Sequence, residues 1–193
     1  SLKKKLKNES RALMTDRGAS TQLLVLDLDG ITFPGAKDKY NTYDIQNIAE
    51  AFVQYLPKEF HNVSYIAQAS ASLGLKANKI SLHLFFLLGH TVQPKILKEW
   101  FRTLNYETDF LADQLKLSAN GQSISYPLDV SLADNSKLIY IAPPKFSGVQ
   151  DPVAGDRFVR IDRSSPILDI NSLIKDVNPE KVHSLSTQIK DGL

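Results

Sequence analysis

The chain contains no cysteine, and this absence excludes several kinds of chemistry at once. Without cysteine there can be no disulfide, no thiolate nucleophile and no cysteine-based zinc site. Long apolar runs are missing too, since the longest falls far short of the about 20 residues that a membrane-spanning helix needs. No signal peptide is visible, so we expect a cytoplasmic protein with no membrane partner.

A strong charge of either sign is also missing. Lysine and arginine number 23 against 21 acidic residues, and the formal net charge of +2 is too small to indicate nucleic-acid binding by itself. The basic opening segment 1–7 is interpreted as a solvated helix start or a frayed arm, with a phosphate-binding tail as the alternative. With 193 residues, 42% hydrophobic and 23% charged, the composition is typical of a globular protein that can bury one core.

The stretch 22–30, Gln-Leu-Leu-Val-Leu-Asp-Leu-Asp-Gly, predicts a buried strand that ends in two carboxylates. Side chains alternate along a strand, so Asp27 and Asp29 project from one face with their Cβ atoms roughly 6.6 Å apart. Adjacent carboxylates repel each other unless a cation lies between them, and oxygen ligands favour Mg²⁺ or Mn²⁺. The alternative is a strand end with two solvated acids before a turn.

The remaining pattern predicts alternating helices and strands, and therefore an α/β (α+β) fold. Helical spacing of apolar residues follows Asp44 and again follows Pro94. Residues 8–21 are expected to be helical and then a loop, 108–117 to add a short helix, and the chain from 166 onward to form one or two helices separated near Asn178. Further strands are predicted over 63–69, 80–88, 128–132, 137–142 and 158–161.

Two of these strands carry polar residues opposite an apolar face. Ser81 and His83 alternate with leucines in the strand 80–88, and Asp129 lies between Leu128 and Val130. If the strands share one sheet, Asp27, Asp29 and Asp129 converge and can hold two cations for an in-line phosphoryl transfer. His83 would then donate to a phosphate, Ser81 could add a hydrogen bond, and Lys76 and Lys79 flank the site. Taken singly, His83 is more often structural and Asp129 more often a loop cap.

The order of these motifs resembles the archaeo-eukaryotic primase superfamily, the primase-polymerases, over roughly residues 22–153. Leu26-Asp-Leu-Asp29 is similar to its first motif, Ser81-Leu-His83 to its second and Leu128-Asp129 to its third. The similarity is closest to primases of phages, plasmids and mobile islands. It includes the linking segments Ser70–Lys76 and Ile139–Pro144.

The resemblance implies a DNA primase, a nucleotidyltransferase that makes primers on single-stranded DNA from nucleoside triphosphates. It assigns Asp27, Asp29 and Asp129 to the catalytic metals, and Ser81 and His83 to the nucleotide. It also implies an RRM-like mixed central sheet flanked by helices, with an added N-terminal αβ unit. Such a catalytic domain, 1–165, would be followed by a helical tail, 166–193, and by a helicase region in a longer chain.

Two other functions remain open at this point. A haloacid-dehalogenase-type phosphatase also has an Asp-x-Asp-Gly motif, with Asp27 as nucleophile and Asp29 as general acid, but it leaves His83 and Asp129 without a role. A non-catalytic replication-initiation or nucleic-acid-binding module could share the primase fold. For a template strand, the candidate basic contacts are Lys76, Lys79, Lys137, Lys145, Arg157 and Arg160.

Overall fold

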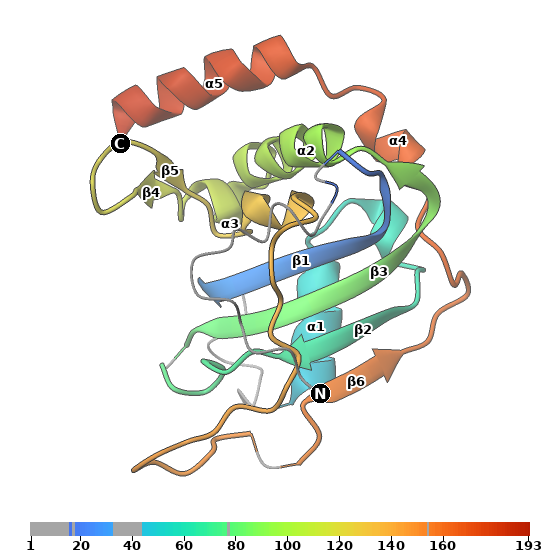
Figure 1. Ribbon diagram of the computed structural model, residues 1–193, viewed down its shortest axis with the longest axis vertical. Helices are drawn as coiled ribbons and strands as arrows, with labels where there is room; N and C mark the ends of the chain where they lie inside the picture. The colour runs from blue at the N-terminus through green and yellow to red at the C-terminus, as the bar shows by residue number, and fades with distance from the viewer. Residues whose placement is uncertain (1–15, 17, 33–43, 77, 154) are drawn as a thin grey trace.

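A four-stranded antiparallel sheet forms the centre of the molecule (Figure 1). The computed structural model describes residues 16, 18–32, 44–76, 78–153 and 155–193. The strands lie in the order β1–β3–β2–β6. Their bounds are β1 Thr21–Ile31, β2 Tyr65–Ala69, β3 Ile80–Val92 and β6 Phe158–Ile161.

One face of this sheet is apolar because leucines recur at every second position of β1 and β3. Leu24, Leu26 and Leu28 are at most 1% exposed, as the sequence pattern predicts. The predicted apolar face of the strand 80–88 is also confirmed, since it is buried throughout; it comprises Leu82, Leu84, Phe86 and Leu88. This face forms the core, and the opposite face carries the polar motif residues beside exposed apolar ones such as Leu87 and Ile66.

Helices α1 and α2 cover the apolar face. α1, Ile45–Val53, lies behind the sheet in Figure 1 and begins at Asp44, whose Oδ1 accepts a hydrogen bond from the Asn47 amide at 3.0 Å. α2, Pro94–Glu107, starts with proline at a position where the missing N–H costs nothing. Trp100 of α2 stacks on Phe60 of the short 3₁₀ helix η2, Lys58–Phe60, and Phe60 contacts Phe86 of β3 edge to face. Both helices that the apolar spacing predicts are therefore confirmed.

The chain after α2 returns to the free edge of β1. α3, Asp109–Ala112, is followed by a small hairpin of β4, Lys116–Leu117, and β5, Ile124–Ser125. Leu128 then forms an antiparallel bridge with Leu28, and the 3₁₀ helix η3 spans Val130–Ala133. The segment that carries Asp129 therefore lies beside β1.

A long irregular segment, residues 134–153 and 155–157, connects η3 to β6. In Figure 1 it runs in front of β1, β3 and β2, on the side opposite the helices. It contacts β2 directly, because the Gln68 side chain donates to the Tyr140 carbonyl oxygen at 3.1 Å. The open face of the sheet is therefore partly covered by this segment.

The C-terminal region forms two helices, α4 Asn171–Ile174 and α5 Pro179–Gly192, with the predicted break at Asn178. α5 packs on α2: Val182 is buried with Tyr106, and the Tyr106 hydroxyl lies 2.7 Å from Ser186 Oγ. The tail is thus attached to the helical side of the domain. No helix in the described ranges has both the length and the apolar character that crossing a membrane requires.

Three sequence expectations differ from the structure. The sheet is not mixed, because every pairing between β1, β3, β2 and β6 is antiparallel. Residues 137–142 do not form the expected strand, and 128–132 supplies one bridge followed by η3. A strand needs a partner edge, and Leu138, Tyr140 and Ile141 instead project into solvent. The expected helix over 8–21 and the added N-terminal αβ unit fall largely outside the described residues.

Candidate active site on the open face of the sheet

Asp27 and Asp29 lie on the open face of β1, as the alternation predicts, because Leu26 and Leu28 take up the core side. Asp27 is directly opposite His83 of β3, and Asp29 is directly opposite Ser81. The Asp27 side chain is 22% exposed, whereas Asp29 is an exposed residue. The first two polar motifs of the sequence therefore meet as neighbouring cross-strand pairs.

His83 lies between two oxygen acceptors. Its Nε2 is 3.4 Å from Asp27 Oδ1, and its Nδ1 is 3.1 Å from Gln68 Oε1 on β2. Gln68 is directly opposite His83 in the β2–β3 pairing and is only 3% exposed. A row of polar side chains, Asp27–His83–Gln68, therefore crosses three adjacent strands on an otherwise largely apolar sheet.

Ser81 supports the turn that follows Asp29. Gly30 is the extra residue of a β-bulge between Asp29 and Ile31, and its φ of +67° belongs to the left-handed region that glycine tolerates. The Gly30 amide donates to Ser81 Oγ at 3.0 Å, and Ser81 is only 2% exposed. The serine thereby fixes the backbone next to the second acid.

Asp129 is held close to Asp27 by the backbone. Its amide donates to the Asp27 carbonyl oxygen at 3.3 Å. The preceding residue, Leu128, is bound on both backbone groups by the fully buried Asn105 of α2: Asn105 Nδ2 donates to the Leu128 carbonyl at 3.1 Å, and Asn105 Oδ1 accepts from its amide at 3.0 Å. The third predicted acid therefore lies at the edge of the same site.

The carboxylate of Asp129 is already paired within the chain. Its Oδ1 accepts from the Ser131 amide at 2.8 Å, so Asp129 caps η3, and its Oδ2 lies 2.9 Å from Lys137 Nζ. Burial of the carboxyl group favours its neutral form, but the hydrogen bonds from Ser131 and Lys137 outweigh this and lower the pKa of Asp129. Asp129 is thus both a loop cap and a neighbour of Asp27.

Five of the six predicted lysines and arginines divide into three groups, and the sixth, Lys137, is paired with Asp129. Lys79 Nζ lies 3.5 Å from Thr32 Oγ1, at the end of β1 beyond Asp29, whereas Lys76 is exposed and is not brought into this contact. Arg160 and Lys145 are also exposed. Arg157 is a structural residue: it is 6% exposed, pairs with Asp151 and donates to the Ser70 carbonyl oxygen. Its guanidinium is therefore not free to bind a template.

The sequence reading missed the residues that position the site. Gln68 is hydrogen-bonded to His83 and Asn105 holds the Leu128 segment, while Lys137, which the sequence suggested only as a template contact, pairs with Asp129. A polar residue within the apolar strand 63–69 was a signal for Gln68, and an asparagine on the apolar side of α2 was one for Asn105. Neither residue type indicates which side chain or backbone group it contacts in the fold.

The donor set of this face suits a hard divalent cation. Asp27 and Asp29 offer carboxylate oxygens from one face of β1, and such oxygens are what Mg²⁺ and Mn²⁺ prefer. No three histidine or acidic side chains in the described part of the chain come together as a ready metal cluster. The carboxylate of the third acid, Asp129, is bonded to Ser131 and Lys137.

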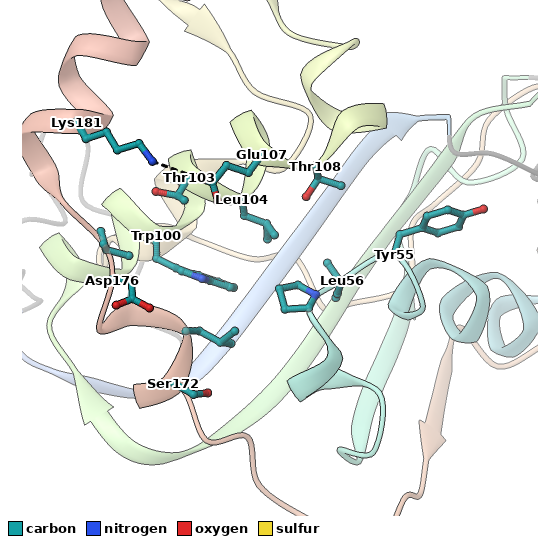
Figure 2. Close-up of a pocket in the computed structure, with 13 residues that line it drawn as sticks. Tyr55, Leu56, Trp100, Thr103, Leu104, Glu107, Thr108, Ser172, Asp176 and Lys181 are labelled. Carbon is teal, nitrogen blue, oxygen red and sulfur yellow. Dashed lines mark ion pairs between the residues drawn. The ribbon is translucent and has the colours of Figure 1, made fainter.

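A separate cleft of about 510 Å³ lies on the helical side (Figure 2). It is lined by residues of α2, α4 and α5 and of the segment after α1, including Tyr55, Trp100 and Asp176. An ion pair of 3.8 Å joins Lys181 to Glu107 at its rim. None of the predicted site residues lines this cleft. The polar row Asp27–His83–Gln68 on the open sheet face is therefore separate from this cleft.

No family model, no curated protein and no solved structure matches this chain. The function therefore has to follow from the residues and geometry of the chain itself.

Proposed function

We propose that this chain is the catalytic domain of a primase-polymerase, which makes primers on single-stranded DNA by metal-dependent nucleotidyl transfer. The observation that carries the proposal is the meeting of three distant motifs at one place. Asp27 is opposite His83, Asp29 is opposite Ser81, and the Asp129 amide is bonded to Asp27. These are the residues that the resemblance to primase-polymerases assigns to metal and nucleotide.

The order of the elements also supports this proposal. The run β1–α1–β2–β3–α2, with β3 between β1 and β2, has the split β-α-β arrangement that RRM-like folds share. The Leu128 bridge lies beside β1, at the edge where such a fold has its fourth strand. β6 differs, because it pairs with β2 at the opposite edge. We therefore propose an RRM-like core with a C-terminal strand added on the β2 side.

Within this proposal each side chain has a defined part. Asp27, Asp29 and Asp129 would hold the divalent ions, which neutralise the triphosphate and activate the primer hydroxyl when bound. His83 presents Nε2 on the same side as Asp27, where it can contact a phosphate. Ser81 keeps the bulge after Asp29 in place, and Lys79 adds positive charge near the end of β1. The substrate would be a nucleoside triphosphate.

A primer-synthesis assay tests the proposal directly. The full chain is incubated with single-stranded DNA, Mg²⁺ or Mn²⁺, and labelled ribo- and deoxynucleotides. We expect product from the wild type, and in Asp29→Asn a loss beyond the about 10- to 100-fold that removing an outer-shell partner of a metal costs. Asp176→Asn, the same change at an exposed site near the helical cleft, is the matched control. Equal activity in Asp29→Asn and wild type would remove Asp29 from the site.

One observation favours a second candidate, a non-catalytic nucleic-acid-binding module on the same fold. The Asp129–Lys137 ion pair, if permanent, leaves the third acid unable to bind a cation. This module would bind single-stranded DNA without incorporating any nucleotide, and Asp29→Asn would then leave its only activity unchanged. The same assay therefore separates the two functions. The phosphatase alternative uses neither His83 nor Asp129, although both lie beside Asp27.

A further inference from the structure

Gln68 is the nearly buried link between His83 and the segment that crosses the sheet. Its Oε1 lies 3.1 Å from His83 Nδ1, and its Nε2 donates to the Tyr140 carbonyl oxygen at 3.1 Å. We propose that Gln68 is a positioning residue: locked by the Tyr140 carbonyl, it keeps the hydrogen of the neutral His83 ring on Nδ1. The Nε2 atom is then the one that faces Asp27 and an incoming ligand.

The orientation of the Gln68 amide follows from its neighbour. A backbone carbonyl oxygen only accepts hydrogen bonds, so the Tyr140 oxygen requires the NH₂ end of the amide. The amide oxygen must then face His83. Because that oxygen also only accepts, His83 Nδ1 has to be the donor. The carbonyl of an irregular segment thereby determines, through one glutamine, which nitrogen of a histidine is protonated.

Asp27 competes for the same hydrogen. A neutral imidazole has one N–H, and it lies between two acceptors, Gln68 Oε1 at 3.1 Å and Asp27 Oδ1 at 3.4 Å. Gln68 is 3% exposed, so its oxygen has little access to water if Nδ1 does not donate to it, whereas the Asp27 side chain is 22% exposed and can be hydrated. An unpaired buried acceptor is the costlier outcome. The neutral ring of His83 therefore favours the tautomer with its hydrogen on Nδ1.

The consequence for activity rests on the proposed function. With Nδ1 held by Gln68, the ring plane is fixed and Nε2 is directed to the side of the acids, where the triphosphate would bind. Loss of Gln68 would let the hydrogen move to Nε2, where Asp27 accepts it, and would free the ring to turn. Because phosphate oxygens only accept hydrogen bonds, His83 can bind one through Nε2 only as the imidazolium, with Nδ1–H still on Gln68, and a ring that turns no longer holds Nε2 toward the phosphate. Nucleotide binding should weaken, while single-stranded DNA binding should not.

The tautomer can be measured without nucleotide. In ¹⁵N-labelled full chain, long-range ¹H–¹⁵N correlation spectra distinguish the two ring nitrogens of each of the four histidines, and His83→Gln assigns the signals of His83. At a pH where the ring is neutral, we expect the hydrogen on Nδ1 in the wild type. A wild-type spectrum with the hydrogen on Nε2 overturns the proposal, whatever the variants do.

Two substitutions separate positioning from folding. Gln68→Met keeps the length of the side chain but has no hydrogen bond to offer, so the hydrogen should move to Nε2. Gln68→Glu still presents an oxygen to Nδ1 and should keep it there. Nucleotide affinity should fall in Gln68→Met by about 10- to 100-fold, as for other outer-shell partners. Circular dichroism confirms that each variant is folded before its spectrum is used.

The outcomes are distinguishable from those of the proposed function. A shifted tautomer in Gln68→Met with unchanged nucleotide affinity would overturn the positioning role. An unchanged tautomer in the folded Gln68→Met variant would overturn the hydrogen-bond argument itself. If the wild type binds no nucleotide at all, the proposed function is wrong, and the wild-type spectrum still decides how Gln68 acts on His83.

Discussion

His83 and Asp27 are direct cross-strand partners on β3 and β1, with Nε2 and Oδ1 3.4 Å apart. The sequence separates them by more than fifty residues, yet strand register makes them neighbours. Their closeness means that any ligand of one is within reach of the other. The five predictions below concern this pair, the neighbouring Asp129 and the basic residues near the sheet.

Removal of the His83 imidazole should weaken nucleotide binding more than template binding. His83→Ala takes away the Nε2 group that faces the acids, but it leaves the apolar side of β3 intact. We expect nucleotide affinity to fall by at least about 10-fold, in the range of outer-shell losses, while single-stranded DNA affinity stays near that of the wild type. Calorimetric titration with each ligand checks this. If nucleotide affinity is unchanged and the protein melts much earlier, His83 is a structural residue.

Release of Asp129 from Lys137 should make divalent ions bind more tightly. In Lys137→Met the Asp129 carboxylate loses its cationic partner and becomes available to an ion held by Asp27 and Asp29. Because the pair is partly exposed, its loss should change stability by no more than about 1 kcal/mol. Titration with Mn²⁺ measures the affinity, and Lys190→Met on α5 controls for the change in net charge. Weaker binding in Lys137→Met would mean that the lysine helps to build the site.

The dependence of the free energy of unfolding on pH in the acid range should reflect the ionisation of Asp129. Its folded-state pKa is lowered, so ionised Asp129 stabilises the fold at all pH values above its unfolded pKa of about 3.9. This contribution is lost as the pH falls through the lowered folded value. We expect Asp129→Asn to be less stable than the wild type at pH near 7, and the difference to shrink below about pH 4. Urea unfolding across this range is the measurement, and a pH-independent difference would contradict it.

Template binding should depend on exposed cations, of which Arg160 of β6 pairs with the exposed Asp162 at 2.8 Å and Lys145 lies in the segment that crosses the sheet. Arg160 and Lys145 are exposed, and each phosphate contact to a single strand contributes about −0.7 to the slope of log affinity against log salt. Arg160→Gln and Lys145→Gln should each make that slope shallower by about this amount. Lys190→Gln on the helical side is the control and should leave it unchanged. A slope that only the control alters would exclude this face as the template path.

Arg157→Gln offers a contrast within the same set of residues. Its guanidinium lies over the Phe146 ring at 5.5 Å and pairs with Asp151, inside the segment that crosses the sheet. Substitution should therefore lower the melting temperature, because the buried Arg157 side chain loses its ion pair with Asp151 and its hydrogen bond to the Ser70 carbonyl oxygen. Neither the residue type nor the neighbouring sequence distinguishes the buried, structural Arg157 from the exposed Arg160.

The local pattern of the sequence determined the elements and the faces. Alternation by two puts Asp27 and Asp29 opposite the buried leucines of β1, and the same rule puts His83 opposite the apolar side of β3. The helices after Asp44 and Pro94 follow from apolar spacing and from their first residues. These features depend on neighbours a few residues apart, so they could be read without knowing the fold.

Only the tertiary structure decided which of these residues meet. Gln68 reaches His83 because β2 pairs with β3 in one register, and Asp129 reaches β1 because Asn105, from a helix, binds the backbone of Leu128. The segment 137–142 has the composition of a strand but remains irregular, because strand pairing needs a free edge and this segment instead crosses the open face. Register and edge pairing join segments that are far apart in the chain, so no local pattern can specify them.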